Sequence, residues 1–479
     1  MHRAFLSNIV LLVTINLLIK PLYIFGIDRT VQNVVGLEQY GIYFELLGFT
    51  LLFNILNDLG VQNFTSRHIA QHGHLLHKYF PNLLTLKVLA GLSYMGLALG
   101  IGLSLGYTRL HFWLLFVLLL NQIIIGLVQF FRANIIGLGQ YRTDSLLSVL
   151  DRCLMIALCG ALLLVPQWRN EFQITHFVYA HTFSLCLTLL VSFALLRRHL
   201  HQLRFRWNLK LVLVLIRQSL PYALIILLNT AYNRTDALML GQLYSTGTQE
   251  VGIYASAYRL LEAAMMFALL FGNLLVPMFS KMLKSKQSVV ALVRLSFEVL
   301  SAGAITATVA VVVFRAEIMN LLYTADVPYA SDVLAYLMLG FIAASGTFIW
   351  GALLVAAGEL RSLNKIYFGG FVTNVLLNFM LIPEYGAIGA AIATLGTQIV
   401  VLAAKVIISC QLLNFHIWSS LVKLTIFGAL LCSIAYIVQA APLQYWLFGF
   451  VSVLVAGGIL AFLTKLIQVK SLKGLLAEK

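Results

Sequence analysis

The chain has 479 residues, of which 61% are hydrophobic and only 10% are charged, and its formal net charge at pH 7 is +15. A water-soluble fold of this length has too little interior to bury so much apolar surface, so a soluble protein is excluded. We therefore predict an integral membrane protein.

Apolar stretches of about 20 residues follow one another along the chain, and each is long enough to cross about 30 Å of hydrocarbon as a helix. They are continuously apolar and lack the alternation of a membrane-spanning β-strand, which predicts an all-α polytopic bundle. We expect about fourteen membrane helices, at residues 6–27, 39–60, 80–105, 111–135, 144–166, 174–197, 213–240, 251–278, 288–314, 330–356, 363–383, 386–411, 418–438 and 443–467.

The positive charges predict the orientation of the chain. With a cytoplasmic N-terminus, about 20 Lys and Arg residues fall on the cytoplasmic side and about 5 on the other side. This bias favours an even number of spans with both termini in the cytoplasm. The excess charge also attracts anionic membrane lipids, and it gives no reason to expect nucleic-acid binding.

Two stretches about 210 positions apart are nearly the same, GLEQYGIY at residues 36–43 and GTQEVGIY at residues 247–254. In the same order, Ile27-Asp28 aligns with Thr235-Asp236, and GQYR at 139–142 aligns with GELR at 358–361. The alternative is that Gly and Tyr are common at interfacial turns. We predict instead two parallel six-helix lobes, residues 1–205 and 206–412, followed by two additional helices in residues 413–479. This is the plan of an alternating-access transporter.

Charged residues inside the predicted membrane helices are the candidates for a substrate site, because a charge there needs a partner or a wet cavity. Lys20 lies near the middle of the first helix, beside Pro21. Arg259 and Glu262 are three residues apart on the eighth helix and can form an ion pair on one face. By contrast, Lys87, Asp58, Asp151 and Arg152 lie near predicted cytoplasmic helix ends, where we expect their charges to reach the interface.

Four further charges lie where the first and seventh predicted helices end, and Glu45 lies in the second helix. The functional interpretation is a cationic cavity in which Lys20, Arg29, Arg234 and Arg259 bind a pyrophosphate. Asp28, Glu45, Asp236 and Glu262 would then balance the charge of the empty cavity or carry a coupling proton or sodium ion. The alternative is that these charges pair with each other for packing and topology alone.

Three stretches carry a resemblance to a known family. Residues 20–64, beginning KPLYIFGIDRTVQN, residues 221–260, beginning PYALIILLNTAYNRTD, and residues 383–398, PEYGAIGAAIATLGTQ, resemble bacterial oligosaccharide flippases of the Wzx type. That family belongs to the superfamily that also contains multidrug and toxin extrusion (MATE) transporters and the flippase MurJ. The resemblance implies a fold of six, six and two helices. It also implies transport of an undecaprenyl-pyrophosphate-linked oligosaccharide, such as an O-antigen repeat unit, across the bacterial inner membrane. MurJ-like relatives carry basic residues in the first and eighth helices, which favours Lys20 and Arg259.

Two other functions compete with this one. A cation-coupled multidrug antiporter of the same superfamily would bind its cations at acidic residues in an apolar cavity. A membrane glycosyltransferase or polymerase would need a catalytic acid or base on a sizeable outward loop, and the predicted outward loops are short. We therefore expect no enzyme activity and no cofactor. Because two lobes of one chain can form a complete pathway, we also expect a functional monomer.

A histidine-rich loop at residues 67–78 is the one candidate for a metal site. His68 and His72 have helical spacing, with His74 and His77 close by. Because the loop offers no Cys and no nearby acid, we predict that it holds no metal.

Overall fold

The computed structural model describes residues 14–16, 18–58, 61, 65, 76–197, 209–441, 445–464 and 466, with the side chains of 76–79 and 209–222 left out of the description. Every regular element in these ranges is a helix, which confirms the predicted all-α polytopic fold. The chain packs as two compact units, Met1–Gly252 and Ile253–Lys479. The predicted division into repeats at residues 205 and 412 stays a prediction.

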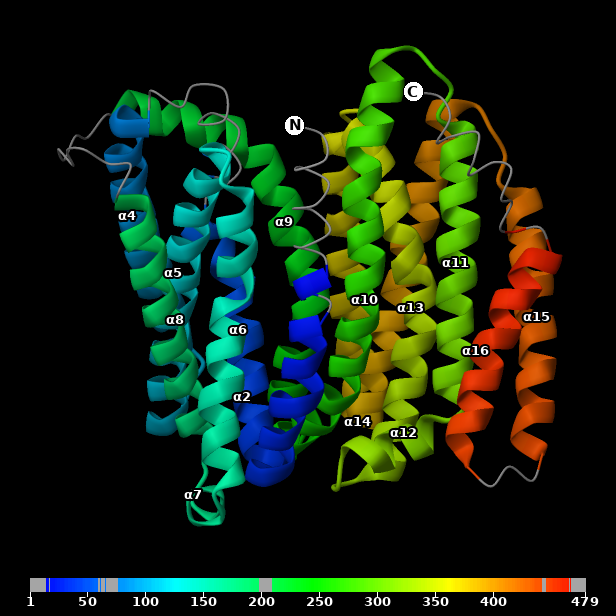
Figure 1. Ribbon diagram of the computed structural model, residues 1–479, viewed down its shortest axis with the longest axis horizontal. Coiled ribbons are helices and arrows are strands. Elements are labelled where there is room, and N and C mark those ends of the chain that lie inside the picture. Colours follow the sequence, from blue (N-terminus) through cyan, green and yellow to red (C-terminus); the bar gives the residue numbers. More distant parts are fainter. Residues whose placement is uncertain are drawn as a thin grey trace. The chain divides into compact units, whose positions relative to one another are not determined.

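The N-terminal unit is a helical bundle in which α2 contacts α4, α5, α8 and α9 (Figure 1). Its elements are η1 (Tyr23–Asp28), α2 (Arg29–Asp58), α4 (Leu76–Ser104), α5 (Arg109–Gly137), α6 (Tyr141–Leu164), α7 (Pro166–Asn170), α8 (Ile174–Arg197), α9 (Leu209–Leu243) and the first residues of α10 (Gly247–Lys284).

The C-terminal unit is built around α11 and α13. Its elements are the rest of α10, α11 (Val290–Val313), α12 (Arg315–Leu322), α13 (Val327–Ala356), α14 (Leu360–Leu413), α15 (Trp418–Ala440) and α16 (Trp446–Leu463). Within this unit α13 lies along α14, and α15 and α16 pack together against α11 (Figure 1). A buried hydrogen bond of 2.6 Å from Ser420 Oγ to Glu298 Oε1 joins α15 to α11. The two last helices are thus attached to one helix of the preceding bundle.

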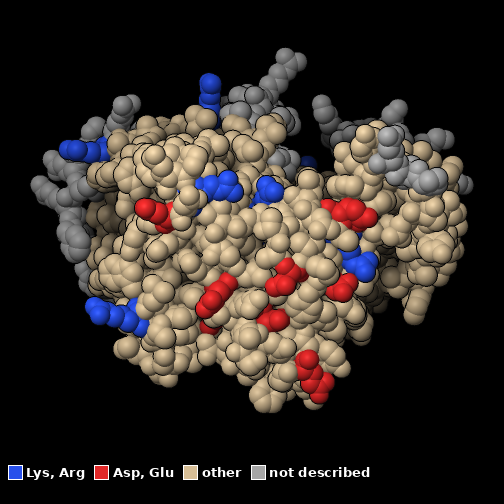
Figure 2. Space-filling model, turned by 90° about the horizontal axis from the view of Figure 1, so that it is seen from below, with Lys and Arg blue, Asp and Glu red and all other residues tan. Residues whose placement is uncertain are grey.

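The number of helices agrees with the sequence-based expectation. Eleven stretches of the described chain are long and apolar enough to cross a membrane. Two of these contain two helices each, because Gly36 (φ 83°) and Gly386 (φ 54°) interrupt the helical backbone. α9 adds a helix of 35 residues, which makes fourteen long segments in the described ranges. Figure 2 shows acidic and basic side chains scattered among other residues on the face seen from below, where helices end.

The first membrane helix is longer than hydropathy predicts. Its predicted end was residue 27, whereas the helix continues through the π-helical element η1 and is interrupted only at Gly36. Pro21 precedes η1, and a proline favours such a local widening because it lacks an N–H and its ring displaces a carbonyl of the preceding turn. Asp28 and Arg29 therefore lie within a helix. Arg234 and Asp236 also lie inside α9, which ends only at Leu243, so neither pair closes a helix as predicted.

The GQYR and GELR motifs form the same turn. Gly139 (φ 78°) follows α5 and Gly358 (φ 80°) follows α13, both in the left-handed region that favours glycine. The N–H of Gly139 donates to the carbonyl of Ile136 and that of Gly358 to the carbonyl of Val355. In both turns the next residue donates to the carbonyl five positions before it, as in a Schellman motif. The shared geometry supports the predicted duplication.

The GIY repeat marks a close main-chain approach within the N-terminal unit. A β-carbon at Gly41 would collide with the carbonyl group of Thr248, and a β-carbon at Gly252 would collide with the carbonyl group of Leu37. Gly41 corresponds to Gly252 in the repeat, and Leu37 corresponds to Thr248. The two contacts are therefore equivalent under the duplication. Gln32 Nε2 supports the approach by donating to the Gly252 carbonyl at 2.8 Å.

We predict that Gly41→Ala and Gly252→Ala each lower the free energy of unfolding by about 1–3 kcal/mol, because the added methyl group must push two main chains apart. The measurement is thermal unfolding of the purified protein in detergent. Gly96→Ala on α4 is the control, since a β-carbon there meets nothing within 4 Å. A Gly41→Ala protein as stable as Gly96→Ala would show that the close approach contributes nothing.

Candidate functional site

Lys20 is the predicted site residue with the least compensated charge. It is half-buried on the first membrane helix, and it makes no hydrogen bond or ion pair with the part of the chain that the structure describes. The charged groups that act on it are Arg152, Asp151 and Arg132. A cation without a paired carboxylate inside a membrane helix is costly and is therefore a candidate for binding an anion.

Asp28 accepts a hydrogen bond from Tyr40, the residue that precedes the first GIY motif. Its side chain is 1% exposed, and Tyr40 Oη donates to its Oδ2 at 2.7 Å. Arg29 and Arg234 are half-buried, and Asp236 is 1% exposed. These four residues thus lie inside the packed N-terminal unit and not at an exposed interface.

Glu45 is a buried carboxylate held by neutral groups. It is 2% exposed, and its Oε1 accepts hydrogen bonds from Gln242 Nε2 at 2.9 Å and from Tyr107 Oη at 3.4 Å. Gly241 makes room for it, since a β-carbon there would collide with the carboxylate. Burial and the neighbouring Glu45 charge raise the pKa of Tyr107, so the phenol remains a protonated donor.

Arg259 and Glu262 form the ion pair that their spacing predicts. Arg259 Nη1 lies 2.8 Å from Glu262 Oε2, and the side chains are 12% and 19% exposed. The pair lies on α10 within the C-terminal unit, so the charge of Arg259 is compensated locally. The predicted ion pair is confirmed, while the binding role of Arg259 belongs to the proposals below.

Lys20 and Glu45 have neighbours on different helices of the N-terminal unit. The charges that act on Lys20 lie on α6 (Asp151 and Arg152) and α5 (Arg132), whereas Glu45 contacts α9 through Gln242. Arg259 lies in the C-terminal unit. A cavity shared by all four predicted cations therefore stays a prediction.

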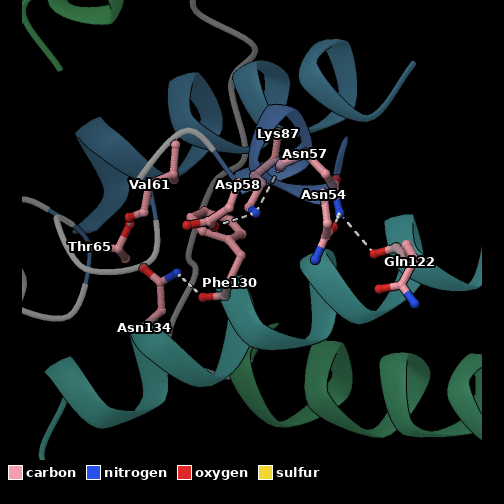
Figure 3. A network of polar contacts seen from close by, with 9 residues as sticks. All are labelled: Asn54, Asn57, Asp58, Val61, Thr65, Lys87, Gln122, Phe130 and Asn134. Atoms are coloured by element: carbon pink, nitrogen blue, oxygen red, sulfur yellow. Dashed lines mark hydrogen bonds and ion pairs between the residues drawn. The ribbon is translucent and has the colours of Figure 1, made fainter. Parts of the chain in front are cut away.

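The expectation that Lys87 reaches the interface is wrong. Its side chain is 1% exposed, and its ammonium group donates to Asp58 Oδ1 at 2.7 Å and to the Asn57 carbonyl at 3.0 Å (Figure 3). Asn57 in turn donates to the Gln122 carbonyl at 2.8 Å. This network joins the end of α2 to α4 and α5. A lysine that pairs with a neighbouring helix has no need to extend to the headgroups.

Glycine makes the Asn57 contact possible. A β-carbon at Gly126 would lie 2.7 Å from Asn57 Nδ2, and one at Gly91 would lie 3.4 Å from its Oδ1. The amide therefore occupies a slot between α4 and α5 that two glycines leave open. Sequence reasoning missed this network because it depends on three helices that are separate in the sequence.

Polar residues of the C-terminal unit were also missed. Asn378 Nδ2 donates to Asn374 Oδ1 at 3.1 Å, and Tyr254 Oη lies 3.2 Å from Thr394 Oγ1. Lys405, 1% exposed, donates to the Thr347 carbonyl at 3.1 Å and to Tyr367 Oη at 3.1 Å. The spacing of four residues between the asparagines was a usable signal, because it places two amides on one face of an apolar helix.

A metal site has no candidate in the described ranges, where no group of three or more His, Cys, Asp or Glu residues could hold an ion. The histidine-rich loop considered above, with His68, His72 and His74, lies outside the described residues, and the side chain of His77 is not described.

Comparison with known proteins gives one family and several structural neighbours. The family described as "Polysaccharide biosynthesis protein" matches residues 5–283. The fold is similar to that of the lipid II flippase MurJ in an inward closed conformation, with a TM-score of 0.70, 12% identity, and coverage of 92% of this chain and 96% of that one. No curated protein sequence matches the chain.

Two transporters of the MOP superfamily have a similar fold. An inward-facing multidrug resistance MATE transporter has a TM-score of 0.64 at 15% identity, with 82% of this chain and 94% of that chain covered. A transporter from Pyrococcus furiosus, described as having a binding pocket of reverse polarity, has a TM-score of 0.55 at 14% identity, with 85% and 94% covered. At these identities the similarity establishes the fold.

We predict that Asp58→Ala destabilises the protein by about 3–5 kcal/mol, because it leaves the buried Lys87 ammonium without its counter-charge. Asp58→Ala/Lys87→Met should recover part of that loss, since the double variant buries no charge there. Unfolding of the three proteins in detergent at one pH measures both effects. A double variant less stable than Asp58→Ala alone would contradict a stabilising role of charge pairing at this site.

Proposed function

Because the chain belongs to the family of polysaccharide biosynthesis proteins, we propose that it is a flippase for an undecaprenyl-pyrophosphate-linked oligosaccharide. The family and the fold are of the transporter type. In this proposal the substrate crosses the bacterial inner membrane from the cytoplasmic to the periplasmic leaflet. There it would serve the synthesis of a cell-surface polysaccharide such as O-antigen.

The observation that carries the proposal is the uncompensated charge of Lys20. A drug or metal cation would be repelled by it, whereas a pyrophosphate would supply the missing negative charge. Since a membrane interior solvates ions poorly, this complementarity is stronger there than in water. Lys20 is therefore the residue most suited to hold the charged head of a lipid-linked substrate.

The remaining predicted residues have roles that fit the same cycle. Arg29 and Arg234 would add positive charge in the N-terminal unit, and Arg259 would add it in the C-terminal unit once it separates from Glu262. Alternating access by a single chain would expose the site to each side in turn, with both termini in the cytoplasm. The basic cytoplasmic loops would contact anionic lipids.

Glu45 is the residue best suited to couple transport to an ion. Its partners Gln242 and Tyr107 are neutral, so it can take up a proton or a sodium ion without displacing a basic side chain. Asp28 and Asp236 are also buried, and they would balance the basic residues of the same unit. We infer that Glu45 binds the coupling ion.

The environment of Glu45 also favours a second candidate, a cation-coupled multidrug antiporter. A buried acid held by neutral donors would be a natural binding group for a cation, and MATE transporters share the fold. The two candidates differ in the sign of the cargo, which makes them separable by experiment.

We expect the purified protein in liposomes to expose a fluorescent pyrophosphate-linked oligosaccharide lipid on the opposite leaflet faster than empty vesicles do. Lys20→Ala and Arg259→Ala should slow this at least about tenfold, since each removes a charge-assisted contact. The control is Lys281→Ala, which removes an exposed positive charge from the same helix as Arg259 and should leave the rate unchanged. Wild-type protein no faster than empty vesicles under ion gradients of either direction would refute the flippase.

We expect Glu45→Gln to fold normally, because a glutamine amide can still hydrogen-bond with Gln242 and Tyr107. In the same liposomes, wild-type transport should accelerate under a proton or sodium gradient, and Glu45→Gln transport should not respond to it. A variant that keeps the full gradient response would exclude Glu45 as the coupling residue. If instead a cationic dye is transported and the lipid is not, the antiporter is the correct function.

A further inference from the structure

The first membrane helix faces α6 along a row of polar side chains inside the N-terminal unit. Asn16 Nδ2 donates to Ser148 Oγ at 3.0 Å. One turn further along α6, the guanidinium carbon of Arg152 lies 4.5 Å from the centre of the Tyr23 ring. Lys20 follows Asn16 by four residues and precedes Tyr23 by three, which places it on the same helix face. Lys20 therefore lies on the side of the first membrane helix that faces Arg152 on α6. The two helices are in contact through η1.

The charged groups that act on Lys20 include more positive than negative charge. Asp144 accepts two hydrogen bonds from Arg132, at 2.7 Å and 3.3 Å, so these two charges neutralise each other. Asp151 Oδ2 lies 3.4 Å from Arg152 Nε. Each of these carboxylates is matched by an arginine. Of the charged groups that act on Lys20, two are arginines, Arg152 and Arg132, and one is a carboxylate, Asp151. The surroundings of Lys20 are therefore more positive than negative.

A buried imidazole lies within range of the same arginine. His181 on α8 is 8% exposed, its Nε2 has no hydrogen-bond partner among the described residues, and the charge of Arg152 acts on it. A buried ring nitrogen without a partner costs about 1–3 kcal/mol relative to a satisfied one. An oxyanion bound beside Arg152 would supply the acceptor that an Nε2–H requires.

The Tyr23 ring contacts the guanidinium of Arg152. Stacking on an aromatic face holds the plane of an arginine, and the edge of that plane has the geometry to donate two parallel hydrogen bonds to phosphate oxygens. The Lys20 ammonium complements this edge as a mobile point charge. The sequence alone suggested that Arg152 extends to the interface, and it did not indicate the contact with Tyr23.

We propose that Lys20 and Arg152, with Tyr23 as the positioning residue, form a binding site for a phosphate-type oxyanion. The identity of the ligand rests on the proposed function, under which it is the pyrophosphate of the lipid-linked substrate. The headgroup phosphate of an anionic membrane lipid has the same chemistry, so the experiment must separate these two sources.

The test is equilibrium binding of radiolabelled geranylgeranyl pyrophosphate to the full-length protein in detergent micelles. Lys20→Ala and Arg152→Gln should each weaken binding about tenfold or more, as expected for loss of a charge-assisted hydrogen bond. Lys20→Arg should retain most of the affinity. Arg142→Gln is the matched control, because it removes the same charge from an exposed position on the same helix. Thermal unfolding of each variant shows whether it has folded.

The outcomes separate the site from the function. Equal affinity of folded Arg152→Gln and Arg142→Gln would overturn the two-residue site, even if wild-type protein translocates the lipid. If the wild-type protein translocates the lipid but binds no geranylgeranyl pyrophosphate, the two-residue site is overturned as well. If the wild-type protein neither translocates nor binds, the proposed function is refuted too. Competition by inorganic pyrophosphate but not by phosphatidylglycerol in mixed micelles supports the substrate as the ligand. Equal competition by phosphatidylglycerol supports the oxyanion site and assigns it to a lipid headgroup.

Discussion

A charged side chain in a membrane helix is stable only where the protein supplies what water would otherwise provide. Lys87 is satisfied by Asp58, Arg132 by Asp144 and Arg259 by Glu262, with nitrogen to oxygen distances of 2.7 to 2.8 Å. These pairs join helices or neutralise one helix face, so their cations can bind a ligand only after the pair separates. Lys20 and Glu45 differ from them, since no oppositely charged group among the described residues bonds to either one. This contrast distinguishes charges that hold the bundle together from charges that can bind something.

The paired charges and the small residues join the helices of the N-terminal unit that carry its candidate sites. The Lys87 network joins α2, α4 and α5, and the Arg132 to Asp144 bonds join α5 to α6. α6 in turn presents Arg152 to the first membrane helix. Because a binding group works only when its own position is fixed, these structural contacts are what make an oxyanion site at Lys20 and Arg152 plausible in physical terms.

Hydropathy predicted the long helices well, because the cost of exposing backbone groups in hydrocarbon leaves little choice of structure. It failed at the end of the first helix, where Asp28 and Arg29 resembled an exit from the membrane and are instead accommodated inside the protein. The spacing of Arg259 and Glu262 was sufficient to predict their pair, since both lie on one helix. The Lys87 and Arg152 contacts could not be predicted, because their partners Asp58 and Tyr23 lie on other helices and only the packing brings them together.

The two predicted copies of the repeat share backbone contacts and differ in their charges. Gly41 and Gly252 make equivalent approaches to the opposite main chain, and Gly139 and Gly358 close equivalent turns. At such positions any side chain meets a carbonyl group or a strained backbone, so a substitution would alter the scaffold itself. A side-chain charge can change without moving the backbone, provided that its partner changes with it. A scaffold built on such glycines can therefore carry an uncompensated lysine in one part of the chain, as at Lys20, and a neutral pair in another, as at Arg259 and Glu262.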